Sequence, residues 1–243
     1  MIYVVVRATT DWLNEPVFRA QIPKAFAPAI ARWDATFDMP YHHFRHALKR
    51  IAQVSLSRVD GIARVAASEV PEGEIVLPTD DDDWFAPHLA DVLTPHLVEG
   101  ARGYYWPSRF LEVPLSLPHR VTLAWRRVFP NTKPRWLCTT NNYAVVAHRE
   151  TLPLLRTHVG ASHWFIANAP AVRRIEAPLS LQNRNLASQT TLNSVATPAA
   201  LVRRFRRYQP FYRQPAAPDL AWADPYIAMM GELMDGLKLR RDA

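Results

Sequence analysis

The sequence has little cysteine and little glycine, and each shortage excludes a class of site. The single cysteine, Cys138, excludes an internal disulfide and any zinc site built from several cysteines. Only 7 of the 243 residues are glycine, and neither GxGxxG nor GxxxxGK[ST] occurs, which argues against glycine-rich phosphate-binding loops. No run approaches the roughly 18 consecutive apolar residues that a membrane-spanning helix needs.

A secretory signal is also missing from the N-terminus. The apolar run from Ile2 to Val6 has no basic region before it and ends at Arg7. We therefore expect a cytoplasmic protein. Hydrophobic residues make up 49% and charged residues 21% of the chain, so the composition supplies a sizeable core and disfavours disorder.

Positive charge is concentrated late in the chain. The formal net charge is +7, and the stretch from Ala177 to Pro218 contains no Asp or Glu. It contains six arginines: Arg184, Arg203, Arg204, Arg206, Arg207 and Arg213. The last five form a basic segment in which arginine alternates with aromatic residues, a pattern that suits an anionic membrane surface, a phosphate-bearing acceptor or nucleic acid. The alternative is a solvated helix face whose aromatic residues pack on the core.

Strand and helix patterns alternate along the chain. Strands are expected at residues 2–6, 74–78, 103–106, 109–113, 142–146 and 174–177, and helices at 43–56, 88–97, 150–156, from 164 onwards and at 222–239. In the helix at 43–56 we expect Phe44, Leu48 and Ile51 on the apolar face, with Arg45, Lys49 and Arg50 on another. Residues 9–40 are expected to be irregular because four prolines interrupt them. The alternation predicts an α/β domain.

Four consecutive aspartates, Asp80 to Asp83, follow the apolar strand pattern that ends at Pro78. Adjacent like charges repel by about 1 kcal/mol per pair even in a water-like dielectric. A divalent cation removes this repulsion, because Mg²⁺, Mn²⁺ and Ca²⁺ prefer carboxylate oxygens. An isolated acidic run is commonly a solvated loop, but apolar residues flank this one on both sides, with Trp84 and Phe85 directly after it. The pattern therefore favours a metal site.

The stretch from Gly61 to Pro87 resembles the core signature of family 2, GT-A-fold glycosyltransferases. Its shared features, in order, are Arg64, Gly73-Glu74, the strand Ile75–Leu77, Asp80 to Asp83, Trp84 and Pro87. Val65 stands where the family has Asn. The run from Pro178 to Arg184, followed by Ser188 and Thr190, is similar to the family's closing strand and its tail. The resemblance covers about residues 1–195.

This resemblance implies a GT-A-like (Rossmann-related) mixed sheet flanked by helices. It implies a transferase domain at residues 1–197, followed at 198–243 by the basic and aromatic segment and a C-terminal helix. The implied reaction moves a sugar from a nucleoside diphosphate-sugar to a hydroxyl acceptor, a glycan or glycolipid, in polysaccharide biosynthesis, with inversion at the anomeric carbon. A lipid-linked acceptor would also explain the basic segment, through peripheral contact with the inner face of the membrane.

The resemblance also assigns site residues. Asp80, Asp82 and Asp83 would hold Mn²⁺ or Mg²⁺, and Asp80 and Asp81 would contact the donor. Arg64 would lie near the diphosphate, although a surface salt bridge would equally explain it. Arg7 and Thr9 would face the nucleotide base.

The catalytic base is where this sequence departs from the family. The family has a Glu-Asp pair at the start of a helix, and the corresponding residues 160–165 contain no carboxylate. His163 could accept the proton of the acceptor hydroxyl, since an imidazole with a pKa of about 6.5 can be neutral and then accept a proton. The alternative is that Ser162 caps a helix and His163 only packs beside Trp164. Neither Asp91 nor Glu112 fits the position of the base.

Two other groups of residues have weaker patterns. His42, His43 and His46 have zinc-ligand spacing on a helix, but no third ligand is evident, so we expect solvated or packing histidines. Asn141 to Tyr143 could line an acceptor pocket or form an ordinary turn.

Three further function classes compete with the transferase. A nucleotidyltransferase would usually carry a glycine-rich, lysine-containing loop after the first strand, and residues 7–10 offer none. A catalytically degenerate transferase would bind the donor without turnover, which the missing Glu-Asp pair allows. No nucleic-acid-binding motif is present, so we expect no specific nucleic acid as a partner.

Overall fold

The computed structural model describes residues 1–7, 26–66, 69–96, 100–107, 109–112, 142–149, 171–216 and 218–240. The chain divides into two compact units. The first unit comprises Met1–Arg7, Val54–Phe110 and Trp125–Gln182, and the second comprises Ala8–Gln53, Leu111–Ala124 and Asn183–Ala243. The domain division at residue 197 stays a prediction.

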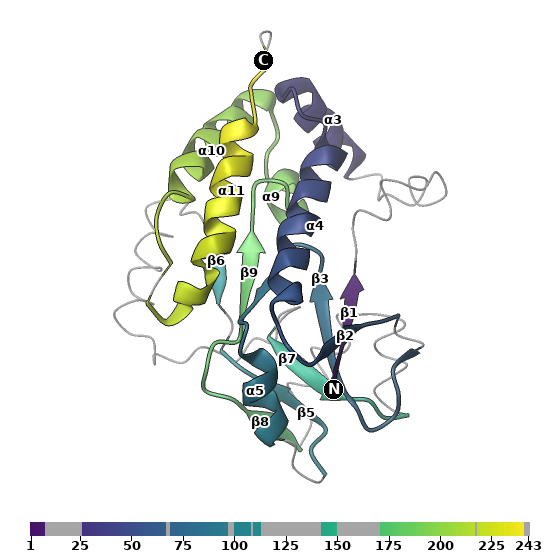
Figure 1. The fold of residues 1–243 in the computed structure, drawn as a ribbon. Coiled ribbons are helices and arrows are strands. Elements are labelled where there is room, and N and C mark those ends of the chain that lie inside the picture. The colour runs from purple at the N-terminus through teal and green to yellow at the C-terminus, as the bar shows by residue number, and fades with distance from the viewer. Residues whose placement is uncertain are drawn as a thin grey trace. The chain divides into compact units, whose positions relative to one another are not determined.

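In the described part of the first unit, six strands form a mixed sheet (Figure 1). They are β1 (Ile2–Arg7), β2 (Ile62–Arg64), β3 (Ile75–Asp80), β5 (Gly103–Tyr105), β7 (Tyr143–Val146) and β8 (Val172–Arg174), in the order β2-β1-β3-β7-β5-β8. β1 is parallel to β2 and to β3, and β5 is parallel to β8. Among these described strands β7 alone runs against its neighbours. The mixed sheet and its accompanying helices confirm the predicted α/β class.

Both faces of this sheet are apolar, because alternate residues of each strand point to opposite sides. On one face Ile2, Val4, Ile75 and Leu77 join one buried cluster. On the other face Val76, Tyr143 and Val145 form a second cluster, against which Tyr3 and Val5 pack. A central strand buried on both faces shows an unbroken apolar run in the sequence, as the one from Ile2 to Val6 does.

Two helices contribute to the first of these clusters. The end of α4 (Tyr41–Ser57) adds Leu56, and α5 (Leu89–Leu93) adds Leu89, Ala90 and Leu93. The 3-10 turn η2 (Thr94–His96) follows α5 directly. The helix predicted at 88–97 is therefore present in a shorter form.

Three further described strands form a small sheet in the order β4-β9-β6. They are β4 (Trp84–Phe85), β6 (Phe110–Glu112) and β9 (Ser180–Arg184). β4 pairs antiparallel with β9, placing Trp84 opposite Leu181 and Phe85 opposite Ser180. A strand is thus present after Pro178, as β9, and its equivalence to the closing strand of the glycosyltransferase family stays a prediction.

The described part of the second unit is mainly helical, apart from the ends of β6 and β9. It contains α3 (Ala27–Thr36), most of α4, α9 (Gln189–Asn193), α10 (Pro198–Phe211), the 3-10 segment η3 (Pro218–Ala223) and α11 (Asp224–Gly236). Aromatic rings fill its core: Trp33 packs on Phe37 and Phe44 at centroid distances of 4.7 and 4.8 Å, and Phe37 packs on Phe205 at 5.3 Å. Such pairs contribute about 0.5–1.5 kcal/mol each beyond the area they bury.

Backbone and side-chain contacts tie the end of the described chain to the turn after α3. Lys238 N–H donates to the Asp38 carboxylate at 3.0 Å, and Arg240 Nε donates to the Phe37 carbonyl at 2.8 Å. Leu239 forms a β-bridge with Phe37. Among the helices within the described ranges, none combines the length and apolar composition needed to cross a bilayer.

The structure also corrects three predictions. The stretch 9–40 is not irregular throughout, since it contains α3; Pro28 lies in the first turn, where a missing N–H breaks no helical hydrogen bond. The strand expected at 174–177 lies mostly earlier, as β8. Arg45 is buried, at 4% exposure, rather than on the polar face with Lys49.

Candidate functional site

The four aspartates lie where β3 ends and the chain turns into β4. Asp80 is the last residue of β3 and is partly exposed, whereas Asp81, Asp82 and Asp83 are 2%, 9% and 2% exposed. We call Asp80–Asp83 the aspartate turn. A buried carboxylate is costly unless hydrogen bonds or a cation compensate for the lost water. The aspartate turn is therefore a group of buried carboxyl side chains and not a solvated loop.

The aspartate turn lies at the carboxyl edge of three parallel strands. The register pairs Arg7, the last residue of β1, with Asp80, and pairs Val4 with Arg64, the last residue of β2. Figure 1 shows β1 and β3 pointing the same way. From β1 the chain reaches β2 on one side of β1 and then β3 on the other, so the strand order reverses at β1. In open α/β sheets, ligands bind outside the carboxyl ends of strands at such a reversal.

Ser55, in the last turns of α4, fixes the backbone that follows the aspartate turn. Its hydroxyl donates to the Phe85 carbonyl at 3.2 Å and accepts from the Phe85 N–H at 2.8 Å. Ser55 is fully buried. Sequence reasoning missed this residue, although a signal was present: Ser55 follows Phe44, Leu48 and Ile51 at helical spacing, which makes it a polar side chain on the apolar face.

A second buried network holds β9 and the start of β7. Trp106 Nε1 donates to the Ser180 hydroxyl at 2.7 Å. The Asn142 amide donates to the Trp106 carbonyl at 2.8 Å, and the Trp106 N–H donates to the Asn142 carbonyl at 3.0 Å. Asn142 and Tyr143 are both buried. These contacts favour the structural interpretation of Asn142 over an acceptor pocket.

The oxygen donors of the aspartate turn suit a hard divalent cation, but they do not form a closed cage. Among the described residues, no three His, Cys, Asp or Glu side chains are grouped so that they could hold a metal ion. Magnesium in nucleotide-binding enzymes is usually held by one or two carboxylates, waters and the phosphates of the substrate. The aspartate turn fits such an open site, in which the protein supplies only part of the ligands of the cation.

The other charged candidates outside the basic segment have different surroundings. Arg64 is exposed at the end of β2, and Asp91 is exposed in the first turn of α5. Glu112 ends β6. Arg109, which the sequence did not single out, is half-buried beside β6, and burial lowers the pKa of its guanidinium.

Several predicted residues lie outside the described residues: Thr9, Asn141, Ser162, His163 and Trp164. For Arg7 the structure describes the strand position alone. The helices expected at 150–156 and from 164 also lie outside the described ranges. The assignment of a catalytic base therefore stays a prediction.

The basic segment forms most of α10. Phe205 and Tyr208 are buried, whereas Arg203, Arg206 and Arg207 are exposed. This arrangement is the predicted alternative in which the aromatic residues pack on the core beneath a solvated helix face. Because these three arginines are exposed, contact of the basic segment with an anionic membrane stays a prediction.

The other two arginines of the basic segment make contacts within the second unit. Arg204 donates to the Thr191 carbonyl at 2.7 Å and to the Ser194 hydroxyl at 2.8 Å, and burial lowers the pKa of its guanidinium. Arg213 pairs with Asp235 at 3.0 Å. The basic segment is therefore less available to an anionic partner than its sequence implies.

Ser188, from the resemblance's tail, also has a local structural role: its hydroxyl accepts from the Thr191 N–H and caps α9. In the first unit, the aspartate turn combines buried carboxylates, a following strand that is hydrogen-bonded to Ser55, and the carboxyl edge of parallel strands. That combination can bind a cation together with a phosphorylated ligand.

Comparisons with protein-family models, curated proteins and solved structures found no match to this chain.

Proposed function

We propose that this protein is a metal-dependent glycosyltransferase with a GT-A-like first unit, transferring a sugar from a nucleoside diphosphate-sugar to a hydroxyl acceptor. The observation that carries the proposal is the position of the aspartate turn. It lies at the carboxyl end of β3, beside the end of β1, where the strand order reverses. The sequence resemblance to family 2 glycosyltransferases, which includes the same aspartates, also supports it.

In this proposal Asp80, Asp82 and Asp83 supply the oxygen ligands for Mn²⁺ or Mg²⁺, with one or two of these carboxylates bound to the cation beside waters and the donor's phosphates. Asp80 and Asp81 contact the donor. When bound, the metal neutralises charge that develops on the departing nucleoside diphosphate. Ser55 keeps the strand after the turn in place, so the carboxylates are already positioned before the donor binds.

Cationic and basic groups complete the proposed reaction. Arg64, exposed at the same strand edge, adds positive charge near the diphosphate. Arg7 and Thr9 face the nucleotide base. His163 accepts the proton of the acceptor hydroxyl as the oxygen attacks the anomeric carbon.

The proposed acceptor is a glycan or glycolipid in surface polysaccharide synthesis. Exposed Arg203, Arg206 and Arg207 on α10 favour a lipid-linked acceptor at an anionic membrane surface, where each cation contributes about 1 kcal/mol. Loss of vesicle binding in a triple arginine-to-glutamine variant would support this. Unchanged binding would remove the membrane from the proposal and leave the transferase in place.

Calorimetry with UDP, GDP, dTDP and CDP, each with and without Mn²⁺, tests the donor site. We expect one nucleotide to bind in the presence of Mn²⁺ and its binding to fall by at least tenfold in Asp82→Asn, which keeps the side-chain shape. Asp91→Asn is the matched control, because it removes an exposed carboxylate of the same unit. Absence of nucleotide binding, or equal binding by wild type and Asp82→Asn, would refute the proposal.

Turnover separates an enzyme from a degenerate binding protein. Release of nucleoside diphosphate from the donor-sugar that binds, lost in His163→Ala, would support the full mechanism. Metal-dependent binding with no release under any acceptor condition would instead identify a nucleotide-sugar-binding protein without catalysis.

A further inference from the structure

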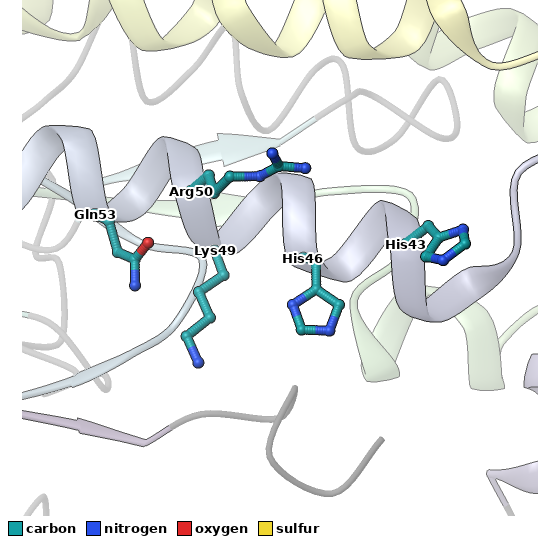
Figure 2. Close-up of a pocket in the computed structure, with 5 residues that line it drawn as sticks. All are labelled: His43, His46, Lys49, Arg50 and Gln53. Carbon is teal, nitrogen blue, oxygen red and sulfur yellow. The ribbon is translucent and has the colours of Figure 1, made fainter. Parts of the chain in front are cut away.

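A hollow lined by basic side chains lies along α4 in the second unit, whereas the aspartate turn belongs to the first. The described side chains that line it are His43, His46, Lys49, Arg50 and Gln53 (Figure 2). We call this the α4 hollow. Its volume is about 410 Å³, within the roughly 300–1,000 Å³ of small-molecule sites. The α4 hollow is therefore large enough for a ligand with several charged groups.

The five side chains come from successive turns of one helix face. At about 100° per residue they fall within an arc of about 120°, opposite the apolar face that carries Phe44 and Leu48. Figure 2 shows His46 and Lys49 projecting from the same side of α4. From His43 to Gln53 the face extends about 15 Å along the helix axis. The potential donors thus form a row and do not converge on a single point.

The charge pattern of α4 is unusual for a solvated helix. The 17 residues of α4 include no Asp or Glu, so no carboxylate of the helix offsets its cations. Lys49 follows Arg45 by four residues, a spacing at which like charges destabilise a helix. The first turn of a helix favours anions, yet the first turn of α4 has no acidic residue. Local rules are commonly broken where a sequence serves a binding site.

We propose that the α4 hollow binds a small ligand carrying at least two phosphate groups. The Arg50 guanidinium suits bidentate contact with a phosphate, and Lys49 supplies a compact positive charge. The imidazoles of His43 and His46 and the amide of Gln53 donate N–H groups along the same row. A single phosphate would contact only a few of the donors in this row. A ligand with two or more phosphates can contact several of them at once.

Calorimetry on the full chain with sodium tripolyphosphate, in EDTA so that no divalent cation is present, tests the proposal. We expect saturable binding to wild type and at least tenfold weaker binding to Lys49→Gln/Arg50→Gln. The matched control, Arg203→Gln/Arg206→Gln, removes the same charge from the exposed face of α10 and should bind as wild type does. Arg50→Lys alone should bind between wild type and the double variant, because it keeps the charge and loses the bidentate geometry.

Two further measurements make the result specific. Inorganic phosphate should bind at least tenfold more weakly than tripolyphosphate, and Asp82→Asn should leave tripolyphosphate binding unchanged, which separates the α4 hollow from the proposed donor site. Unchanged circular dichroism of the double variant would exclude unfolding as the cause of its weaker binding. No saturable binding to wild type, equal binding by wild type and the double variant, or binding confined to anionic vesicles or RNA would overturn the proposal.

Discussion

Replacing Ser55 with alanine tests whether the backbone after the aspartate turn depends on a single side chain. The substitution removes the hydroxyl that satisfies both the N–H and the carbonyl of Phe85, in a fully buried position. A buried polar group left without a partner costs about 1–3 kcal/mol. With two such groups, we expect Ser55→Ala to lower the free energy of unfolding by about 2–4 kcal/mol.

Ser57→Ala is the matched control on the same helix. Ser57 is exposed, and its hydroxyl donates to the Val54 carbonyl at 2.9 Å. Because water can replace that bond, we expect a change within about 0.5 kcal/mol. Thermal unfolding would compare the two variants, with Ser55→Ala lowering the Tm by roughly 5–15 °C for a chain of this size.

Hydrogen–deuterium exchange gives a local measure that does not require two-state unfolding. Peptides containing Phe85 should exchange faster in Ser55→Ala and at the wild-type rate in Ser57→Ala. If both variants unfold and exchange alike, Ser55 does not hold the backbone at Phe85, and the argument that the carboxylates are positioned in advance loses its basis.

Two other predictions concern the second unit. A Cβ at Gly231 would lie 3.1 Å from the Tyr212 carbonyl oxygen, whereas a Cβ at Gly236 would meet open space. Gly231→Ala should therefore be less stable than Gly236→Ala, which we expect to be neutral or stabilising by up to about 1 kcal/mol in the same denaturation assay. The pKa of the Asp235 carboxyl lies below its ordinary value because Arg213 donates a hydrogen bond to it. The stabilising contribution of this carboxyl is therefore present above the pKa that Asp235 has in the unfolded chain, and it is lost as pH falls through the lower pKa of the folded state. Arg213→Gln should raise the pKa of Asp235 in an NMR titration. An unchanged titration would contradict the pairing.

The elements buried on a regular pattern could be predicted from the sequence. The unbroken apolar run at Ile2 to Val6 and the 3.6-residue period at Phe44, Leu48 and Ile51 correspond to β1 and α4. The prediction placed Arg45 on the polar face because its side chain is charged. At about 100° per residue, however, Arg45 points in nearly the same direction around the helix axis as Leu48 and Ala52. Its long side chain is buried on that face.

Elements that depend on distant partners could not be located from local sequence. β8 is a three-residue strand whose limits follow its pairing with β5, and nothing in residues 172–177 alone fixes them. The same limit applies to the site. The aspartate run was evident in the sequence, but its position beside the end of β1 follows from the pairing of Arg7 with Asp80, which residue spacing does not encode.

The position of β1 in the sheet has a consequence for how the protein folds. Ile2 pairs with Ile62 on one side and with Ile75 on the other, so both ladders of this strand close long loops. Loop closure costs entropy before any pairing energy is gained, and parallel strands that pair over long sequence separations form slowly. Until both partners arrive, β1 is an apolar strand with two open edges. The refolding yield of this protein should therefore depend on how well that one strand is kept from pairing with other chains.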